Sequence, residues 1–243
     1  MWSGPRNLST AMMYSFAARN DCAIWDEPFY AAYLKASGSV HPMQKEIMSS
    51  WIQDPKLIEA RCVGDIPEGK TVFYQKHMTH HMLPQFKRSW IGECTNVFLL
   101  RHPARVIASY TVKRENPTLD DLGFRQQAEL FDLVSQLQGK VPVVIDSYSI
   151  RKNPAQMLKE LCETIGLEFQ PAMLKWPQGG HEDDGPWAPH WYNSVWKSTE
   201  FAAPEADLPE VPQELRSIYE QAMIYYLKLE KYALSGATFP ISL

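Results

Sequence analysis

The sequence WSGPRNLSTAMM, residues 2–13, predicts a tight turn that runs directly into a helix. Gly4 permits a close backbone approach, and Asn7 and Ser9 are residue types that commonly cap helix N-termini. The N–H groups at a helix start attract anions, and Arg6 adds a permanent positive charge beside them. We therefore expect this stretch to bind a phosphate-like group, the alternative being an ordinary capped helix.

Short apolar segments alternate with longer helical patterns along the chain. The apolar segments, rich in β-branched and aromatic residues, predict strands at residues 22–29, 71–77, 96–103 and 141–148. Helical periodicity predicts helices at residues 9–19, 104–114, 124–138, 154–166 and 211–233. The runs VFLL and VVI are continuously apolar, as in strands buried on both faces of a parallel sheet. We therefore expect a three-layer α/β fold with a largely parallel sheet flanked by helices.

Residues 176–210 break this alternation. They form a predicted irregular loop that is rich in aromatic residues, among them Trp176, Trp187, Trp191, Tyr192 and Trp196. Long ordered loops are often functional. We expect one domain over residues 1–243, in which the helix at 211–233 packs either inward or against a second subunit of a homodimer. Only Met1 and Trp2 precede Ser3, which leaves two alternatives: a very short first strand, or a true start upstream of this chain.

The composition is that of an ordinary globular protein, with 45% hydrophobic and 21% charged residues among 243. A net charge of −4 gives no overall basic field, so we expect neither nucleic acid nor a membrane as partner. The four cysteines include no C-x-x-C pair, which argues against a structural zinc site. The sequence shows no apolar leader and no run of about 18 apolar residues, and we expect a cytoplasmic protein.

A second segment, LLRHPARVIASY at residues 99–110, places Arg101 at a strand end and Ser109 on the following helix. Arginine can bind a phosphate through two parallel N–H donors, and the serine hydroxyl can add a third contact. The alternative is an arginine in a salt bridge and a serine without a role. The sequence lacks the loop G-x-x-x-x-G-K-[ST], which argues against a Mg²⁺-triphosphate ligand.

Together these segments resemble the sulfotransferases that use 3′-phosphoadenosine 5′-phosphosulfate (PAPS) as donor, and the resemblance covers residues 2–169. The first segment resembles the 5′-phosphosulfate loop, with Arg6 in place of the more familiar lysine. The resemblance implies a P-loop-type nucleotide-binding fold, no metal, and a small-molecule acceptor with a hydroxyl or amine. It implies donor contacts at Gly4, Pro5, Arg6, Asn7, Leu8, Ser9 and Thr10, and at Arg101 and Ser109 in the 3′-phosphate segment, which also contains Pro103.

The family also closes over the nucleotide with a loop near the C-terminus. Residues 179–201, GGHEDDGPWAPHWYNSVWKSTEF, are the segment of this chain that resembles that loop. The resemblance implies that Trp187 or Lys197 contacts the nucleotide. The alternative is that the tryptophans of this segment serve in packing only.

Sulfuryl transfer to an alcohol requires a base that removes the hydroxyl proton. The family places a histidine base just after a strand and after a lysine, which makes His77 the candidate base and Lys76 an assisting cation. Arg6 is expected to stabilise the charge of the leaving phosphate. The usual spacing is Lys-x-His, whereas Lys76 and His77 are adjacent, so His80 is the alternative base. His77, His80 and His81 also fit a metal site, or a loop of histidines without chemistry.

Asp26 and Glu27 lie at the end of the strand predicted at residues 22–29, where they either face the acceptor or hold the turn. Two other functions stay open on the sequence. One is an enzyme or binding protein for another phosphorylated ligand, including a nucleotide kinase-like enzyme. The other is a non-catalytic scaffold that keeps the fold. The sequence does not define the acceptor.

Overall fold

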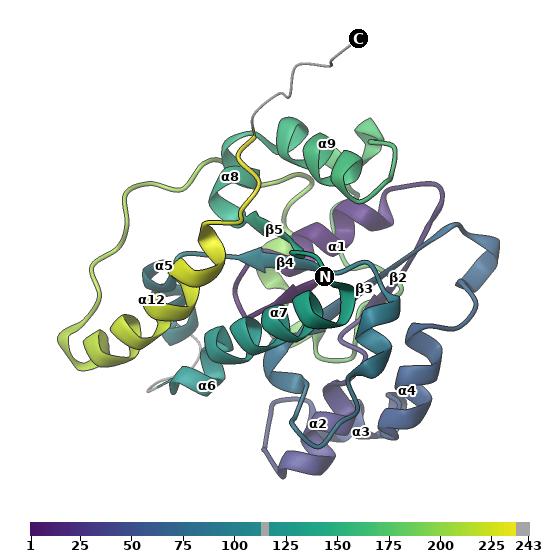
Figure 1. Cartoon of the computed structure of the whole chain (residues 1–243), viewed down its shortest axis with the longest axis horizontal. Helices are drawn as coiled ribbons and strands as arrows, with labels where there is room; N and C mark the ends of the chain where they lie inside the picture. The colour runs from purple at the N-terminus through teal and green to yellow at the C-terminus, as the bar shows by residue number, and fades with distance from the viewer. Residues whose placement is uncertain (113–116, 237–243) are drawn as a thin grey trace.

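A parallel sheet forms the centre of the structure, a computed structural model that describes residues 1–112 and 117–236 (Figure 1). Within these residues the sheet has five strands in the order β2-β3-β1-β4-β5, with every neighbouring pair parallel. The strands are β1 (Trp2–Ser3), β2 (Cys22–Asp26), β3 (Val72–Met78), β4 (Val97–Leu100) and β5 (Val143–Asp146). The predicted parallel α/β sheet is confirmed, with strand ends shifted by a few residues.

Helices cover both faces of this sheet and give the three layers that the sequence predicts (Figure 1). Helices α1 and α9 pack on one face, and α5, α7 and α12 pack on the other. Within β4 the alternating side chains of Phe98 and Leu99 are fully buried against the two different layers. The longer helices are α1 (Ser9–Ala17), α5 (Pro103–Thr111), α7 (Phe124–Gln138), α9 (Pro154–Thr164) and α12 (Arg216–Glu230).

Shorter helices lie in the segments that follow strands β2, β4 and β5, and they were not predicted individually. They are α2 (Tyr30–Ser37), α3 (Gln44–Ser50), α4 (Pro55–Cys62), α6 (Leu119–Leu122) and α8 (Ser147–Lys152). Each spans too few turns to show a clear helical period in the sequence. The predicted helix at 104–114 corresponds to α5, and its residues 113 and 114 lie outside the described residues. No helix in the described ranges is long and apolar enough to cross a bilayer.

The segment at residues 176–210 is largely irregular, as predicted, but it contains two short helices. These are α10 (Ala188–Trp191) and α11 (Asn193–Trp196). The predicted helix at 211–233 is shorter, because α12 begins at Arg216 after a 3₁₀ turn at Gln213–Leu215. Tyr226 of α12 is buried in the same hydrophobic cluster as Phe98 of β4 and Val144 of β5.

Strand β1 has only two residues, yet it lies in the middle of the sheet between β3 and β4. Its register pairs Trp2 with His77 on one side and with Phe98 on the other. Side chains supplement this short ladder: Trp2 Nε1 donates to Asn96 Oδ1 at 2.7 Å. The amide of Gln127 on α7 donates to the Leu99 carbonyl at 2.8 Å. The loop that follows β1 therefore leaves the centre of the sheet from an anchored position.

The backbone of that loop packs directly against the turn between α6 and α7. A Cβ on Gly4 would lie 2.6 Å from the Leu122 carbonyl oxygen, so only glycine fits there. Gly123 has a φ of +74°, and a Cβ on it would lie 2.8 Å from Thr79 Oγ1 and 3.3 Å from Gly4 Cα. These close approaches fix the start of the loop against α7.

We expect Gly123→Ala to lower the free energy of unfolding by about 2–4 kcal/mol, because a left-handed backbone and a steric clash both oppose the new methyl group. The matched control is Gly139→Ala, since Gly139 has a φ of +63° but a Cβ added to it would meet no atom within 4 Å. It should cost only about 1 kcal/mol. Denaturant unfolding of both variants measures the difference, and equal losses would contradict the packing argument.

Candidate active site

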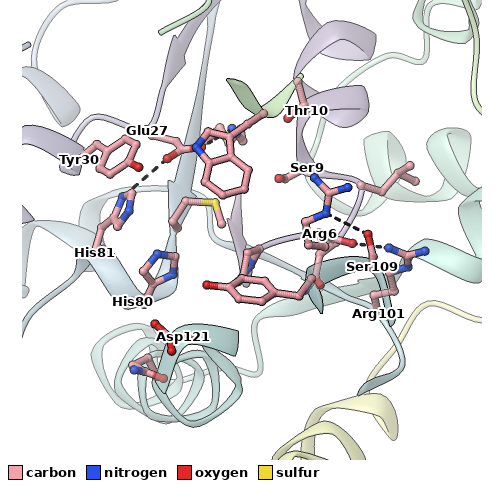
Figure 2. Close-up of a pocket in the computed structure, with 18 of the residues that line it drawn as sticks. Arg6, Ser9, Thr10, Glu27, Tyr30, His80, His81, Arg101, Ser109 and Asp121 are labelled. Carbon is pink, nitrogen blue, oxygen red and sulfur yellow. Dashed lines mark hydrogen bonds and ion pairs between the residues drawn. The ribbon is translucent and has the colours of Figure 1, made fainter. Parts of the chain in front are cut away.

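A cavity of about 700 Å³ opens at the carboxyl ends of the parallel strands. All five described strands contribute to it through the residues that follow them, including the loop at 5–11, Glu27, His80, Arg101 and Ser147. Ligands of open α/β sheets bind at this edge. Figure 2 shows two ends of the cavity, one with Arg6, Arg101 and Ser109 and the other with histidines and Glu27.

The loop after β1 lines the first end of this cavity. Residues from Pro5 to Thr10 all border it, whereas Gly4 lies behind them and serves in backbone packing. Arg6 and Leu8 have φ angles of 63° and 73°, an unusual conformation for residues with side chains. The Asn7 side chain is buried, and its amide donates to the Leu99 carbonyl at 3.2 Å. Asn7 therefore ties the loop to β4.

The start of α1 has no side-chain cap. Leu8 occupies the N-cap position, so the cap expected from Asn7 or Ser9 is not formed. The Leu8 carbonyl accepts the first helical hydrogen bond, from Met12 N. Uncapped N–H groups at a helix start can bind an anion, and here they border the cavity together with the Ser9 and Thr10 side chains.

Arg6 and the segment after β4 meet at this end of the cavity (Figure 2). Arg6 Nε donates to Ser109 Oγ on α5 at 2.9 Å, and Arg101 Nη1 donates to the Arg6 carbonyl at 2.6 Å. Burial, and then the charge of Arg101, lower the pKa of Arg6. The two segments singled out in the sequence thus form one cationic site, and an anion bound there would relieve the repulsion between the arginines.

The second end of the cavity is built from aromatic and imidazole rings. His80 and His81 follow β3 in a 3₁₀ turn at Thr79–His81, and their ring centroids are 4.4 Å apart. His81 is buried and stacks on Tyr30 and Tyr33 at 4.4 and 4.7 Å. Burial holds the pKa of His81 well below its usual range. Figure 2 shows the His80 imidazole on the side of the cavity that also carries Asp121.

Lys76 is fully engaged in a buried polar cluster at the edge of the cavity. Its ammonium contacts Asp26 Oδ1 at 2.8 Å and Glu27 Oε1 at 2.7 Å, and it donates to the Tyr192 hydroxyl. The Tyr192 hydroxyl in turn donates to Asp26 Oδ2 at 2.7 Å. Burial opposes the charge on Lys76, but the two carboxylates outweigh it and raise its pKa. Lys76 is thus a buried, protonated ion-pair partner.

His77 does not face the cavity. Its ring stacks on Trp2 with centroids 4.6 Å apart and lies among Phe29 and Trp90, and its Nε2 is 3.1 Å from Gln75 Oε1. Burial holds its pKa well below the usual range. Adjacent residues of a strand point to opposite faces, so Lys76 and His77 cannot both face the cavity. The structure therefore contradicts the expected position of His77 at the reacting atoms.

The C-terminal loop reaches the cavity through residues other than those predicted. Trp187 is fully buried, donates to the Tyr192 hydroxyl at 2.9 Å, and packs at 5.2 Å from Trp51. Lys197 is exposed and does not border the cavity. The residues of this loop that do border it include Trp191, Ser194, Val195 and Ser198. Trp191, Ser194 and Val195 lie on α10 and α11, and Ser198 follows α11. Their helical spacing is the sequence signal that could have identified them.

A metal site was the other interpretation of the histidines. Among the residues that the structure describes, no group of three or more His, Cys, Asp or Glu side chains is arranged to hold a metal ion.

The chain is similar in sequence to two curated proteins. Two curated relatives from Arabidopsis thaliana are named branched-chain-amino-acid aminotransferase-like proteins 2 and 1. They are 32% and 33% identical to this chain over 98% and 93% of its length. The chain spans only 43% and 40% of the length of these relatives.

Solved structures with a similar fold include the sulfotransferase domain of the Synechococcus PCC 7002 olefin synthase. It has a TM-score of 0.51 and 17% identity, over 96% of this chain and 94% of that domain. The sulfotransferase domain from the curacin biosynthetic pathway also has a TM-score of 0.51, with 15% identity over 91% and 95% of the two chains. At these identities the similarity concerns the fold. The family model described as "Sulfotransferase domain" matches residues 1–233, and the chain therefore belongs to the sulfotransferase-domain family.

Proposed function

We propose that this chain transfers the sulfuryl group of PAPS to a hydroxyl or amine of a small-molecule acceptor. One observation carries the proposal: the loop after β1 and the segment after β4 join in one cationic site through the Arg6–Ser109 hydrogen bond. The two segments are 103 residues apart in sequence. A donor that carries phosphate groups at two positions of one nucleotide needs two such segments side by side, one for each group.

The positive charge at the first end of the cavity supports this donor. The uncapped start of α1, with Arg6, Ser9 and Thr10, would take the 5′-phosphosulfate. Arg101 and Ser109 would take the 3′-phosphate. The loop has neither a second glycine nor the lysine that ATP chemistry requires, so the site favours a nucleotide without a Mg²⁺-triphosphate.

The acceptor would enter from the second end. There His80 borders the cavity after β3, as Met78 and Glu27 also do, and it replaces His77 as the proposed base. His80 would accept the proton of the acceptor hydroxyl while the new O–S bond forms and the bond to the donor phosphate breaks. Arg6 would balance the negative charge that remains on the leaving phosphate. Lys76 would assist the reaction only indirectly, because its ion pair holds Glu27 in place at the cavity.

The direct test is turnover of PAPS with a panel of uncharged phenols, primary alcohols and amines. We expect release of 3′-phosphoadenosine 5′-phosphate (PAP) together with a sulfated product, and loss of both in Arg6→Ala. Use of ATP–Mg²⁺ by the protein, without any use of PAPS, would favour a nucleotide kinase-like enzyme instead.

Arg101→Ala should weaken PAP binding about 10- to 100-fold, because it removes a charged donor from the 3′-phosphate. Adenosine 5′-phosphate lacks that phosphate and serves as the matched ligand, so its affinity should change by less than about threefold. Calorimetry of the variant with both ligands makes the comparison. Equal losses of affinity for the two ligands would show that Arg101 supports the loop and does not contact the 3′-phosphate.

His80→Ala should lower kcat about 10²- to 10⁴-fold and leave PAP affinity unchanged, because it removes the base and no donor contact. His77→Phe is the control: it should alter the unfolding temperature more than kcat, since His77 packs among aromatic rings outside the cavity. Steady-state rates and thermal unfolding of both variants separate the two roles. A catalytic loss in His77→Phe with full activity in His80→Ala would restore His77 as the base.

A further inference from the structure

The carboxylate of Glu205 lies at the centre of three arginines that come from three different elements. Arg101 follows β4, Arg105 lies on α5 and Arg151 lies on α8. Arg101 Nη2 donates to Glu205 Oε1, and Arg151 Nη1 lies 2.9 Å from the same oxygen. Arg105 Nε is 3.5 Å from Glu205 Oε2. With a side-chain exposure of 7%, this carboxylate is a buried internal ligand of a cationic cluster.

The same arginines also hold the backbone on both sides of Glu205. Arg151 donates through Nε to the Ala203 carbonyl at 2.9 Å, and Arg105 Nη2 donates to the Ala206 carbonyl at 2.6 Å. Residues 202–206, which we call the strap, are otherwise irregular chain between Phe201 and α12. Its attachment therefore rests mainly on side chains that are also suited to binding anions.

Two of these arginines face the proposed donor site. Arg101 and Arg151 border the cavity, as does Ala202 of the strap. Both terminal nitrogens of Arg101 already donate, Nη1 to the Arg6 carbonyl and Nη2 to Glu205. A phosphate could gain the paired donors of Arg101 only by taking the place of the Glu205 carboxylate. A carboxylate that stayed in place would repel the phosphate.

We propose that Glu205 fills the anion subsite of Arg101, Arg105 and Arg151 in the ligand-free protein, and that a phosphate monoester of the bound nucleotide displaces it. This inference rests on the proposed function for the identity of the nucleotide. Displacement exchanges a single negative charge for a phosphate of about −2 and releases the strap. Glu205 thus sets the affinity for nucleotides that carry the additional phosphate, and the strap moves when such a nucleotide binds.

Glu205→Gln tests the competition, because it keeps the size of the side chain and removes its charge. We expect PAP to bind about tenfold more tightly to this variant, whereas adenosine 5′-phosphate binds as before. Glu210→Gln is the matched control, since it makes the same charge change five residues away, at an exposed position that forms no ion pair within the described part of the chain. Weaker or unchanged PAP binding in Glu205→Gln would instead mean that Glu205 holds the arginines in place for the ligand.

Hydrogen exchange of the unmodified protein provides a second test that does not depend on the folding of a variant. On addition of PAP, amides of the strap should exchange faster while those of residues 5–11 exchange more slowly. Slower exchange in both segments would overturn the displacement. Inorganic pyrophosphate is the probe that separates this inference from the donor assignment. If PAP does not bind but pyrophosphate binds more tightly to Glu205→Gln, the subsite stands and the proposed donor is wrong; no tightening for either probe overturns the subsite.

Discussion

The position of the loop after β1 depends on a strand of only two residues in the centre of the sheet. Such a strand offers few backbone hydrogen bonds, so buried side chains complete the anchor: Trp2 to Asn96, and Asn7 to the Leu99 carbonyl. The close approach of Gly4 to the Leu122 carbonyl fixes the other side of the loop. Each contact removes freedom from the backbone that carries Arg6. The geometry of the cationic site is therefore a consequence of packing at the sheet centre.

Charge divides the cavity into two ends with different chemistry. At one end the single cation of Lys76 faces the two carboxylates of Asp26 and Glu27, and burial raises the pKa of Glu27. Removal of one partner from such a buried cluster would leave an uncompensated charge. At the other end Arg101, Arg105 and Arg151 surround the single carboxylate of Glu205. Arg6, which hydrogen-bonds to Ser109, adds a fourth cation to this end. The cationic end is suited to a polyanionic donor. The other end, where two carboxylates face one lysine, is suited to an acceptor without a negative charge.

Much of the fold could be predicted from the sequence because its signals are local. The helix at 124–138 was located at both ends, since Gly123 and Gly139 each adopt the left-handed conformation that ends or begins a helix. The spacing of Arg101 and Ser109 was also informative, because a strand end and the next helix fix their relative position. The resemblance placed His77 at the reacting atoms, whereas the structure packs its ring among aromatic rings outside the cavity. Strand alternation already implied that Lys76 and His77 point to opposite faces.

Contacts between segments that are distant in the chain could not be predicted from the sequence. Trp187 is fully buried because it packs on Trp51, which lies far away in the sequence, whereas Trp191 borders the cavity. Glu205 contacts Arg101 only because the strap folds back to a residue 104 positions earlier in the sequence.

The central claim is that the joined loops bind a nucleotide with two separate phosphates. Calorimetric titration with PAP, ATP–Mg²⁺ and adenosine 5′-phosphate tests it directly. We expect micromolar binding of PAP, about −8 kcal/mol, and at least tenfold weaker binding of the other two; tighter binding of ATP–Mg²⁺, or no binding of PAP, would contradict it.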